Sequence, residues 1–240
     1  MRSFWSFKGN GKYDIGCTGQ TVFLYDKQGE ELARFKDLKY AYKSEISPKG
    51  DIFAVKSNLG TIAVYSLDPP ALIKKLRLPH MTDSDENFCF SPDGTELYDL
   101  AMFTDKADSF PYPAILIYDT SDFSLKDRIS YPDRSVELLA IEYQNYTDGI
   151  FLQGYFRNKH GIGVRPFVAK LKDRELKDHA RITKEEELFY MQYINLRGSG
   201  FARKNYEWTF LTLELEKLKT AGHSLAKLWA YRREHKVDLE

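Results

Sequence analysis

The side chains that could do chemistry are few, and they are spread along a chain of 240 residues. Asp83, Asp85 and Glu86 form the densest acidic run and could offer oxygen ligands to Ca²⁺. The run lacks the glycine and the distant bidentate glutamate of a calcium-binding loop, so we interpret it as a solvated loop. The histidines are scattered, with no cysteine or carboxylate at a spacing suited to zinc. The sequence therefore predicts no metal site.

Patterns for catalysis are equally weak. Gly161-Ile162-Gly163 is a glycine pair at an expected hairpin tip, and no helix follows it as a dinucleotide-binding loop requires. No Gly-x-Ser-x-Gly nucleophile motif occurs. Asp14, Asp51 and Asp99 lie near expected strands and could act as paired carboxylates, but strand alternation cannot show that they converge. We expect a protein that is not an enzyme and that binds no cofactor.

The elements that would position these residues follow a repeated pattern. The turn Ser47-Pro48-Lys49-Gly50 recurs as Ser91-Pro92-Asp93-Gly94, and Gly50 and Gly94 lie 44 residues apart. A β-branched and aromatic run follows each turn, at 61–66 and at 114–119, as at 21–26 in the first unit. A motif that recurs at an interval of about 40 to 45 residues indicates repeated structural units, and we expect each unit to be a four-stranded meander.

Five units and a terminal helix account for the whole chain. We place the units at residues 3–36, 44–78, 87–130, 136–182 and 188–216; the last is the most diverged. In residues 217–240, Leu218, Gly222, Leu225 and Trp229 recur at helical spacing. We expect this helix to pack on the preceding repeats and to cover an exposed strand edge. Docking to a partner is the alternative role for the helix.

The repeats resemble the blades of β-propellers, in particular WD-repeat-like blades. The resemblance is carried by the turns at 10–11, 47–50, 91–94 and 147–149, and by the pairs at 25–26, 65–66 and 118–119 that end each third strand. The five repeats contain neither the Trp-Asp dipeptide nor the Gly-His pair of strict WD repeats. The resemblance implies an all-β protein, a propeller of about five four-stranded antiparallel blades with one C-terminal α-helix.

Propeller topology also suggests a working face. Loops between second and third strands, and links between blades, emerge on one rim, and the long segments at 79–86, 104–113 and 157–166 all belong to these classes. Function concentrates on loops that a rigid scaffold holds. The candidate partner-binding residues on this rim are His80, Asp83, Asp85, Glu86, Phe110, Tyr112, Lys159 and His160. Two alternatives stay open: the insertions are neutral drift, or Phe110 and Tyr112 fold back on their own blade.

Composition narrows the choice of partner and compartment. The formal net charge is zero, which argues against nucleic acid or an acidic membrane as the main partner. Cys17 and Cys89 are the only cysteines and lie in different repeats, so we expect two buried free thiols and no disulfide. No signal peptide or long apolar run is present, and we expect a cytoplasmic monomer.

Taken together, the sequence predicts a non-enzymatic scaffold that binds another protein through one loop rim. A bacterial adaptor and an immunity-type protein that neutralises a toxin both fit this description. The alternative from another class is a carbohydrate- or small-ligand-binding propeller, or a hydrolase, with carboxylates in a central pocket.

Overall fold

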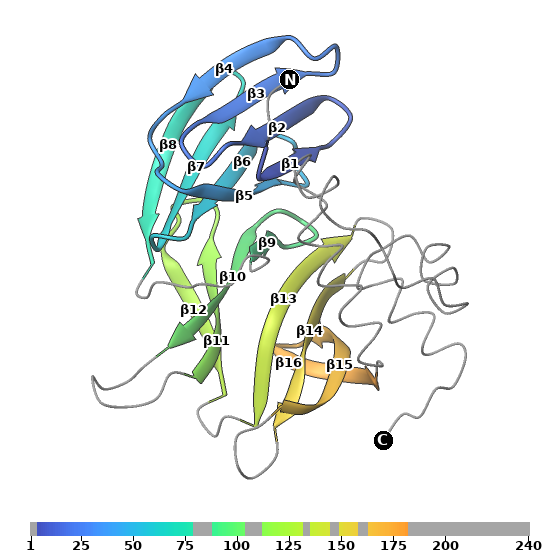
Figure 1. The fold of residues 1–240 in the computed structure, drawn as a ribbon. Coiled ribbons are helices and arrows are strands. Elements are labelled where there is room, and N and C mark those ends of the chain that lie inside the picture. Colours follow the sequence, from blue (N-terminus) through green and yellow to red (C-terminus); the bar gives the residue numbers. More distant parts are fainter. Residues whose placement is uncertain are drawn as a thin grey trace. The chain divides into compact units, whose positions relative to one another are not determined.

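The computed structural model describes residues 4–78, 88–103, 112–131, 135–144, 149–157 and 163–181, and these form four antiparallel sheets of four strands each (Figure 1). In every sheet the strands pair in the order of the sequence, so each sheet is a meander. The predicted four-stranded units are thus confirmed. The fifth unit at 188–216 and the helix at 217–240 lie outside the described residues.

The first two sheets come from the first third of the chain. The first contains β1 (Ser6–Gly9), β2 (Tyr13–Cys17), β3 (Val22–Asp26) and β4 (Glu31–Phe35). The second contains β5 (Ala41–Ile46), β6 (Ile52–Ser57), β7 (Thr61–Leu67) and β8 (Pro70–Arg77). It begins at Ala41, earlier than the predicted boundary at residue 44, because Ala41 pairs with Ser57 and extends the first hairpin.

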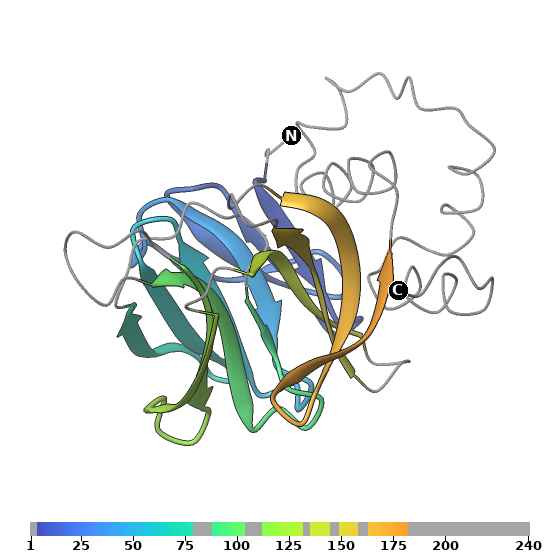
Figure 2. The ribbon, with the colours of Figure 1, turned by 90° about the horizontal axis from the view of Figure 1, so that it is seen from below.

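The third and fourth sheets follow in the same order. The third contains β9 (Phe88–Phe90), β10 (Glu96–Phe103), β11 (Tyr112–Asp119) and β12 (Leu125–Ser130). The fourth contains β13 (Val136–Gln144), β14 (Gly149–Arg157), β15 (Gly163–Lys172) and β16 (Glu175–Arg181). Figure 2 shows the strong twist of this last sheet, drawn in yellow to orange, and each of its three strand pairs contains a register shift.

The recurring Ser-Pro-x-Gly phrase forms the same tight turn twice. Gly50 donates its N–H to the carbonyl of Ser47 at 2.8 Å, and Gly94 donates to Ser91 at 2.9 Å. Both glycines have positive φ, 71° and 67°, which glycine adopts without steric cost. The Ser-Pro-x-Gly motif therefore forms the turn between the first and second strands of a sheet, and its recurrence marks the second and third repeats.

The chain divides into two compact units, which we describe separately. Unit 1 holds β1–β8 and unit 2 holds β9–β16. In unit 1 the apolar core lies between its two sheets and includes Ile15, Leu24, Phe53 and Tyr65. In unit 2 the core likewise joins the two sheets and includes Ile115, Ile117, Leu152 and Phe167. In each unit, burial of apolar side chains from both sheets is the main stabilising contribution.

Two expectations about the chain as a whole can be compared with the described residues. Cys17 and Cys89 are both free and buried, as predicted. No helix long and apolar enough to span a membrane occurs in the part of the chain that the structure describes.

Candidate functional site

Two connections within the blades of unit 2 leave from the ends of second strands, and one of them, residues 104–111, is the longest connection between strands of one sheet. β10 ends at Phe103, which pairs with Tyr112 at the start of β11, so residues 104–111 join these strand ends. β14 ends at Arg157, which pairs with Gly163 at the start of β15, so residues 158–162 do the same in the fourth sheet. In unit 1 the matching connections are shorter, from Cys17 to Val22 and from Ser57 to Thr61.

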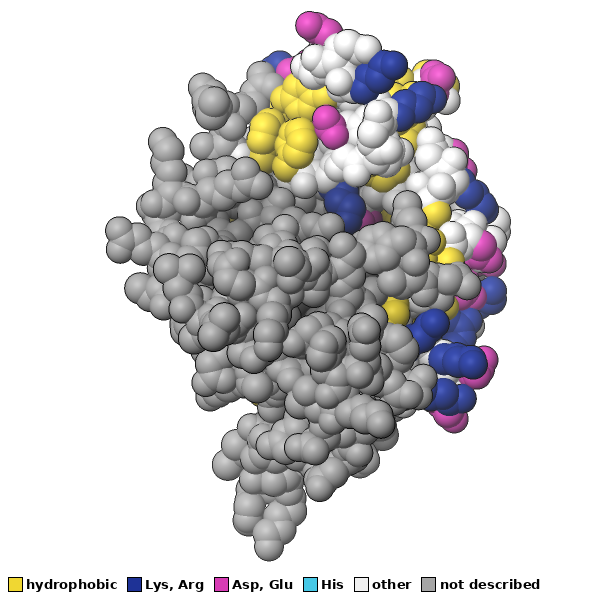
Figure 3. Space-filling model, turned by 90° about the vertical axis from the view of Figure 1, so that its right-hand side faces the viewer, with side chains coloured by type: hydrophobic (Ala, Val, Ile, Leu, Met, Phe, Trp, Pro, Cys, Tyr) yellow, Lys and Arg dark blue, Asp and Glu magenta, His cyan; other side chains and the backbone are white. Residues whose placement is uncertain are grey.

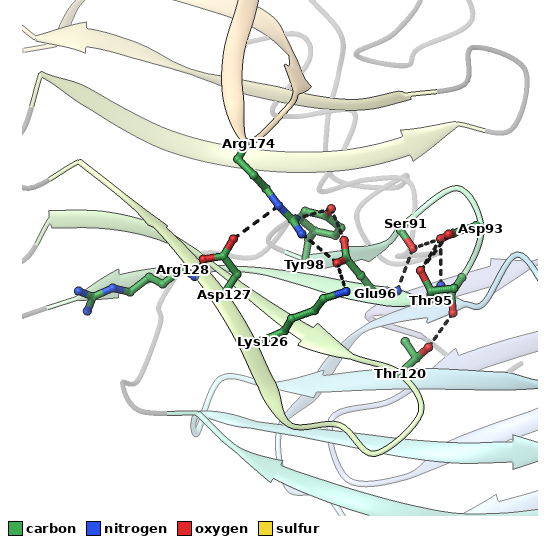
Figure 4. A network of polar contacts seen from close by, with 11 residues as sticks. Ser91, Asp93, Thr95, Glu96, Tyr98, Thr120, Lys126, Asp127, Arg128 and Arg174 are labelled. Atoms are coloured by element: carbon green, nitrogen blue, oxygen red, sulfur yellow. Dashed lines mark hydrogen bonds and ion pairs between the residues drawn. The ribbon is translucent and has the colours of Figure 1, made fainter.

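A cross-sheet contact shows that these two connections leave unit 2 on the same side. Arg174 lies in the turn between β15 and β16, beside the start of β14, because Ile150 pairs with Leu171. The guanidinium of Arg174 binds Glu96, the first residue of β10, at 2.9 Å (Figure 4). The second strands of both sheets therefore start at one end of unit 2, which we call the turn end. Both finish at the opposite end, which we call the loop end.

The link that enters the third sheet also arrives from the loop end. β9 is antiparallel to β10, with Phe88 opposite Asp99 and Phe90 opposite Leu97. The strand thus begins at the loop end and runs towards the turn end, so residues 79–87 join it at the loop end. All three segments that the sequence singled out therefore attach to unit 2 at its loop end.

The strand ends that carry these segments are held by polar contacts. The guanidinium of Arg157 pairs with the carboxylate of Glu137 at 3.1 Å. The backbone N–H of Arg157 donates a hydrogen bond to the backbone carbonyl of Ser135 at 2.8 Å. The N–H of Tyr131 donates to the carbonyl of Pro113 at 3.1 Å. These bonds fix the bases of the connections on the rigid sheets, which is what a loop-borne binding surface requires.

Of the predicted partner-binding residues, only Tyr112 lies among the described residues. It is the first residue of β11 and is 5% exposed, so it is not the exposed anchor that the rim hypothesis assigned to it. The hairpin extends two residues further than the expected strand at 114–119, and this extension draws Tyr112 into the sheet. His80, Asp83, Asp85, Glu86, Phe110, Lys159 and His160 lie outside the described residues.

The three acidic residues considered for catalysis lie in different surroundings. Asp14 is half-buried in β2, Asp51 is exposed in a turn, and Asp99 is fully buried in β10. Across the described ranges, no three histidine, cysteine or acidic side chains gather in a way that could hold a metal ion.

The turn end carries an ion network that sequence reasoning missed. The carboxylate of Glu96 accepts hydrogen bonds from the Tyr98 hydroxyl at 2.6 Å and from Arg174, and it pairs with Lys126 at 2.8 Å (Figure 4). Arg174 also donates to the Tyr98 hydroxyl at 2.7 Å and lies 3.5 Å from the carboxylate of Asp127. The network joins β10 and β12 of the third sheet to the β15–β16 turn of the fourth.

Glu96 is charged despite its burial. Burial by itself raises the pKa of the Glu96 carboxyl, but hydrogen bonds from Arg174, Lys126 and Tyr98 outweigh it and lower the pKa to about 2. Burial, together with the hydrogen bond to Glu96, raises the pKa of Tyr98, so its hydroxyl stays protonated and donates. The network is thus a charged clamp between two sheets, in which Glu96 stays ionised and Tyr98 stays protonated near neutral pH.

Comparisons with known proteins bear on the fold. No protein-family model matches the chain, and no curated protein matches it. Among solved structures 890 chains match, and such breadth indicates a widely used scaffold. One is Kuenenia stuttgartiensis hydrazine synthase, with 16% sequence identity, a TM-score of 0.52, and coverage of 72% of this chain and 51% of that chain.

The fold is a β-propeller. This follows from the four-stranded meandering sheets and from the structural likeness together. The present chain spans about half the length of the hydrazine synthase chain. At this identity the likeness extends to the fold alone, and the blades of this propeller are not thereby assigned to the WD-repeat class.

Proposed function

We propose that this protein is a non-enzymatic propeller scaffold that binds another protein through the loop end of unit 2. The observation that supports the proposal is the asymmetry between the two ends of its blades. Residues 79–87, 104–111 and 158–162 all attach at the loop end. At the turn end, hydrogen-bonded turns at 91–95 and 120–124 close the hairpins of the third sheet, and the Glu96 network links the two sheets.

Such an asymmetry suits recognition of a protein surface. A rigid base lowers the conformational entropy that is lost when loops become ordered on a partner, so more of the contact energy appears as affinity. The longer segments 79–87 and 104–111 supply the area that a specific interface needs, and the strands to which they connect are held in rigid sheets. An adaptor and a toxin-neutralising immunity protein would both use such a face.

The test is affinity capture with the full-length protein from its source organism, followed by a binding measurement with the captured protein. A loop-end variant combines Phe110→Ala, His160→Ala, Asp83→Asn, Asp85→Asn and Glu86→Gln. A matched turn-end variant combines Lys172→Ala and Glu175→Gln, two exposed positions beside the β15–β16 turn. The proposal expects loss of binding in the loop-end variant and retention in the turn-end variant. If both variants bind the partner as tightly as the wild type, or if both lose binding equally, the partner does not bind specifically at the loop end and the proposal is refuted.

A further inference from the structure

The outermost strand of the second sheet, β8, differs from the outer strands of the other three sheets. The order β5-β6-β7-β8 leaves one side of β8 without a paired strand among the described residues (Figure 1). β8 has eight residues, whereas β4, β12 and β16 have five, six and seven. A long edge of this kind presents backbone donors and acceptors that a further strand can use.

The pairing of β7 with β8 shows which backbone groups of β8 point outward. Leu78 donates its N–H to the carbonyl of Gly60 at 2.8 Å, directly beyond the last residues of the ladder. Hydrogen-bonded pairs alternate with other pairs along an antiparallel ladder, so the N–H and C=O groups of Lys75 and Arg77 point away from β7. The register shift in this strand pair comes before these residues. The regular outer edge therefore comprises residues 74–78.

The side chains of β8 combine exposed apolar groups with positive charge. Leu72 is 39% exposed and Ile73 is 49% exposed. The charged residues of the strand are Lys74, Lys75 and Arg77, and β8 contains no acidic residue, whereas β4, β12 and β16 each contain at least one. Figure 3 shows the more common arrangement on another face, where basic and acidic side chains are interspersed over the described surface. The edge of β8 is thus cationic.

One acidic group lies close to this edge. The Nζ atom of Lys75 donates to the backbone carbonyl of Asp37 at 2.9 Å and lies 4.0 Å from its carboxylate. The two side chains are 43% and 36% exposed, so water screens this pair and their mutual attraction is weak. Lys36 and Lys39 flank Asp37 in the sequence and are also exposed. The surroundings of β8 therefore keep an excess of positive charge.

We propose that the outer edge of β8 binds an extended acidic segment of a partner protein as a fifth strand of the second sheet. The backbone groups of Lys75 and Arg77 supply the hydrogen bonds, and acidic side chains at alternate positions lie opposite these two cations. A second copy of the chain, paired through its own β8, sets positive charges against positive charges, so charge complementarity favours an acidic partner. The inference stands apart from the proposed function, which concerns the loop end of unit 2.

Nuclear magnetic resonance of the full-length protein tests the proposal with a synthetic probe. The probe is a peptide of alternating valine and glutamate, long enough to pair with residues 74–78. The largest chemical-shift changes are expected at the backbone N–H groups of Lys75 and Arg77. Glutamates opposite these cations direct their own N–H groups to β8, so N-methylation of the glutamates should weaken binding at least about tenfold. N-methylation of the valines keeps the same charge and should leave binding unchanged. Equal binding of the two methylated peptides, no binding of the parent peptide, or shift changes confined to other strands would overturn the proposal.

A pair of charge variants separates recognition by this edge from a general electrostatic attraction. K74E/R77E reverses two charges on β8, and K27E/K49E makes the same change in total charge at exposed turn positions of the same unit. Peptide binding should fall at least about tenfold in K74E/R77E and stay within about twofold of the wild type in K27E/K49E. An equal loss in both variants, or no loss in K74E/R77E, would contradict the assignment. A dimer in sedimentation whose interface protects β8 from hydrogen exchange would assign the edge to a second copy and would also overturn it.

Discussion

Replacing Arg174 with alanine tests the link between the third and fourth sheets. Arg174 has a φ of 65° and Asp173 a φ of 53°, so both residues of the turn are in the left-handed region. Alanine carries a β-carbon as arginine does, and the backbone strain at this position therefore cancels between the two proteins. The difference in unfolding free energy then reports the loss of the guanidinium and of its contacts.

The size of the effect follows from the contacts of Glu96. The Glu96 side chain is 11% exposed, and the guanidinium of Arg174 donates to it at 2.9 Å and to the Tyr98 hydroxyl at 2.7 Å. A hydrogen bond to a charged group contributes about 1.5–3 kcal/mol, and removal of one partner leaves a buried charge less satisfied. Arg174 is 36% exposed, so water replaces part of what is lost. We expect Arg174→Ala to lower the unfolding free energy by about 2 kcal/mol at neutral pH.

The effect should depend on pH in a defined direction. The pKa of Glu96 falls from 4.5 to about 2 on folding, since hydrogen bonds led by that of Arg174 outweigh the opposing effect of burial. A carboxyl with a lowered folded-state pKa contributes stability above its unfolded pKa, and this stability is lost as the pH falls through the folded value. Without Arg174 the folded-state pKa of Glu96 rises, so protonation of Glu96 lowers the unfolding free energy of the variant by less than that of the wild type. The difference between wild type and variant should therefore shrink as the pH falls from about 5 towards 2.

Urea unfolding followed by circular dichroism gives the free energies, and hydrogen exchange of peptides from β10 and β15 localises the change to unit 2. Lys177→Ala is the matched control, because Lys177 pairs with exposed carboxylates, those of Asp173 and Glu175, in the same hairpin. It should leave stability unchanged. In a Glu96→Gln background, Arg174→Ala should cost much less. A pH-independent loss, or a loss of the same size in the Glu96→Gln background, would refute the clamp.

Three further predictions follow from local geometry. Gly154→Ala should destabilise the protein by more than about 2 kcal/mol in urea unfolding, because its β-carbon would lie 2.0 Å from the carbonyl oxygen of Glu137. Gly29→Ala, in open space at a φ of 85°, should cost only about 1 kcal/mol, and equal costs would contradict this account. Burial raises the pKa of Cys17 to about 12, so iodoacetamide should label it at pH 8 only after unfolding, and rapid labelling of the native protein would show the assignment to be wrong. NMR titration of Asp93 should give a pKa of about 2, since neighbouring serine and threonine groups donate hydrogen bonds to its carboxylate, and a value near 3.8 would argue against those bonds.

The repeated blades were predictable because their signals are local. Gly50 and Gly94 follow Pro by two positions in turns of identical length, and both adopt the positive φ that such turns need. The β-branched and aromatic runs after them fall on β7 and β11, whose side chains are mostly buried on both faces. Turn chemistry and strand composition can be recognised in a few residues of sequence, so no long-range contact had to be known.

The clamp at the turn end could not be predicted for the opposite reason. Glu96 and Arg174 are separated by 78 positions; Glu96 directly follows a turn and Arg174 lies within one, where a charged residue normally indicates a solvated loop. The burial of Tyr112 also depends on a pairing with Phe103, across a connection whose sequence contains prolines on both sides of this tyrosine. Sequence pattern placed the strand start at residue 114 because prolines weaken strand signals. In both cases the contact joins residues that are not neighbours in the sequence, and the residues around each partner do not indicate that contact.

The same clamp predicts that extra residues destabilise unit 2 more at its turn end than at its loop end. One extra residue between Asp173 and Arg174 would move the guanidinium away from Glu96, whose contact is only 2.9 Å, and the charged carboxylate would remain buried. Extra residues in 104–111 would add only loop-closure entropy, which grows slowly with length. The loop end can therefore change its sequence and length at little cost in stability, whereas the turn end fixes how the two sheets pack. A protein that varies its recognition surface on a constant scaffold needs this separation, which supports the proposal that a partner binds at the loop end.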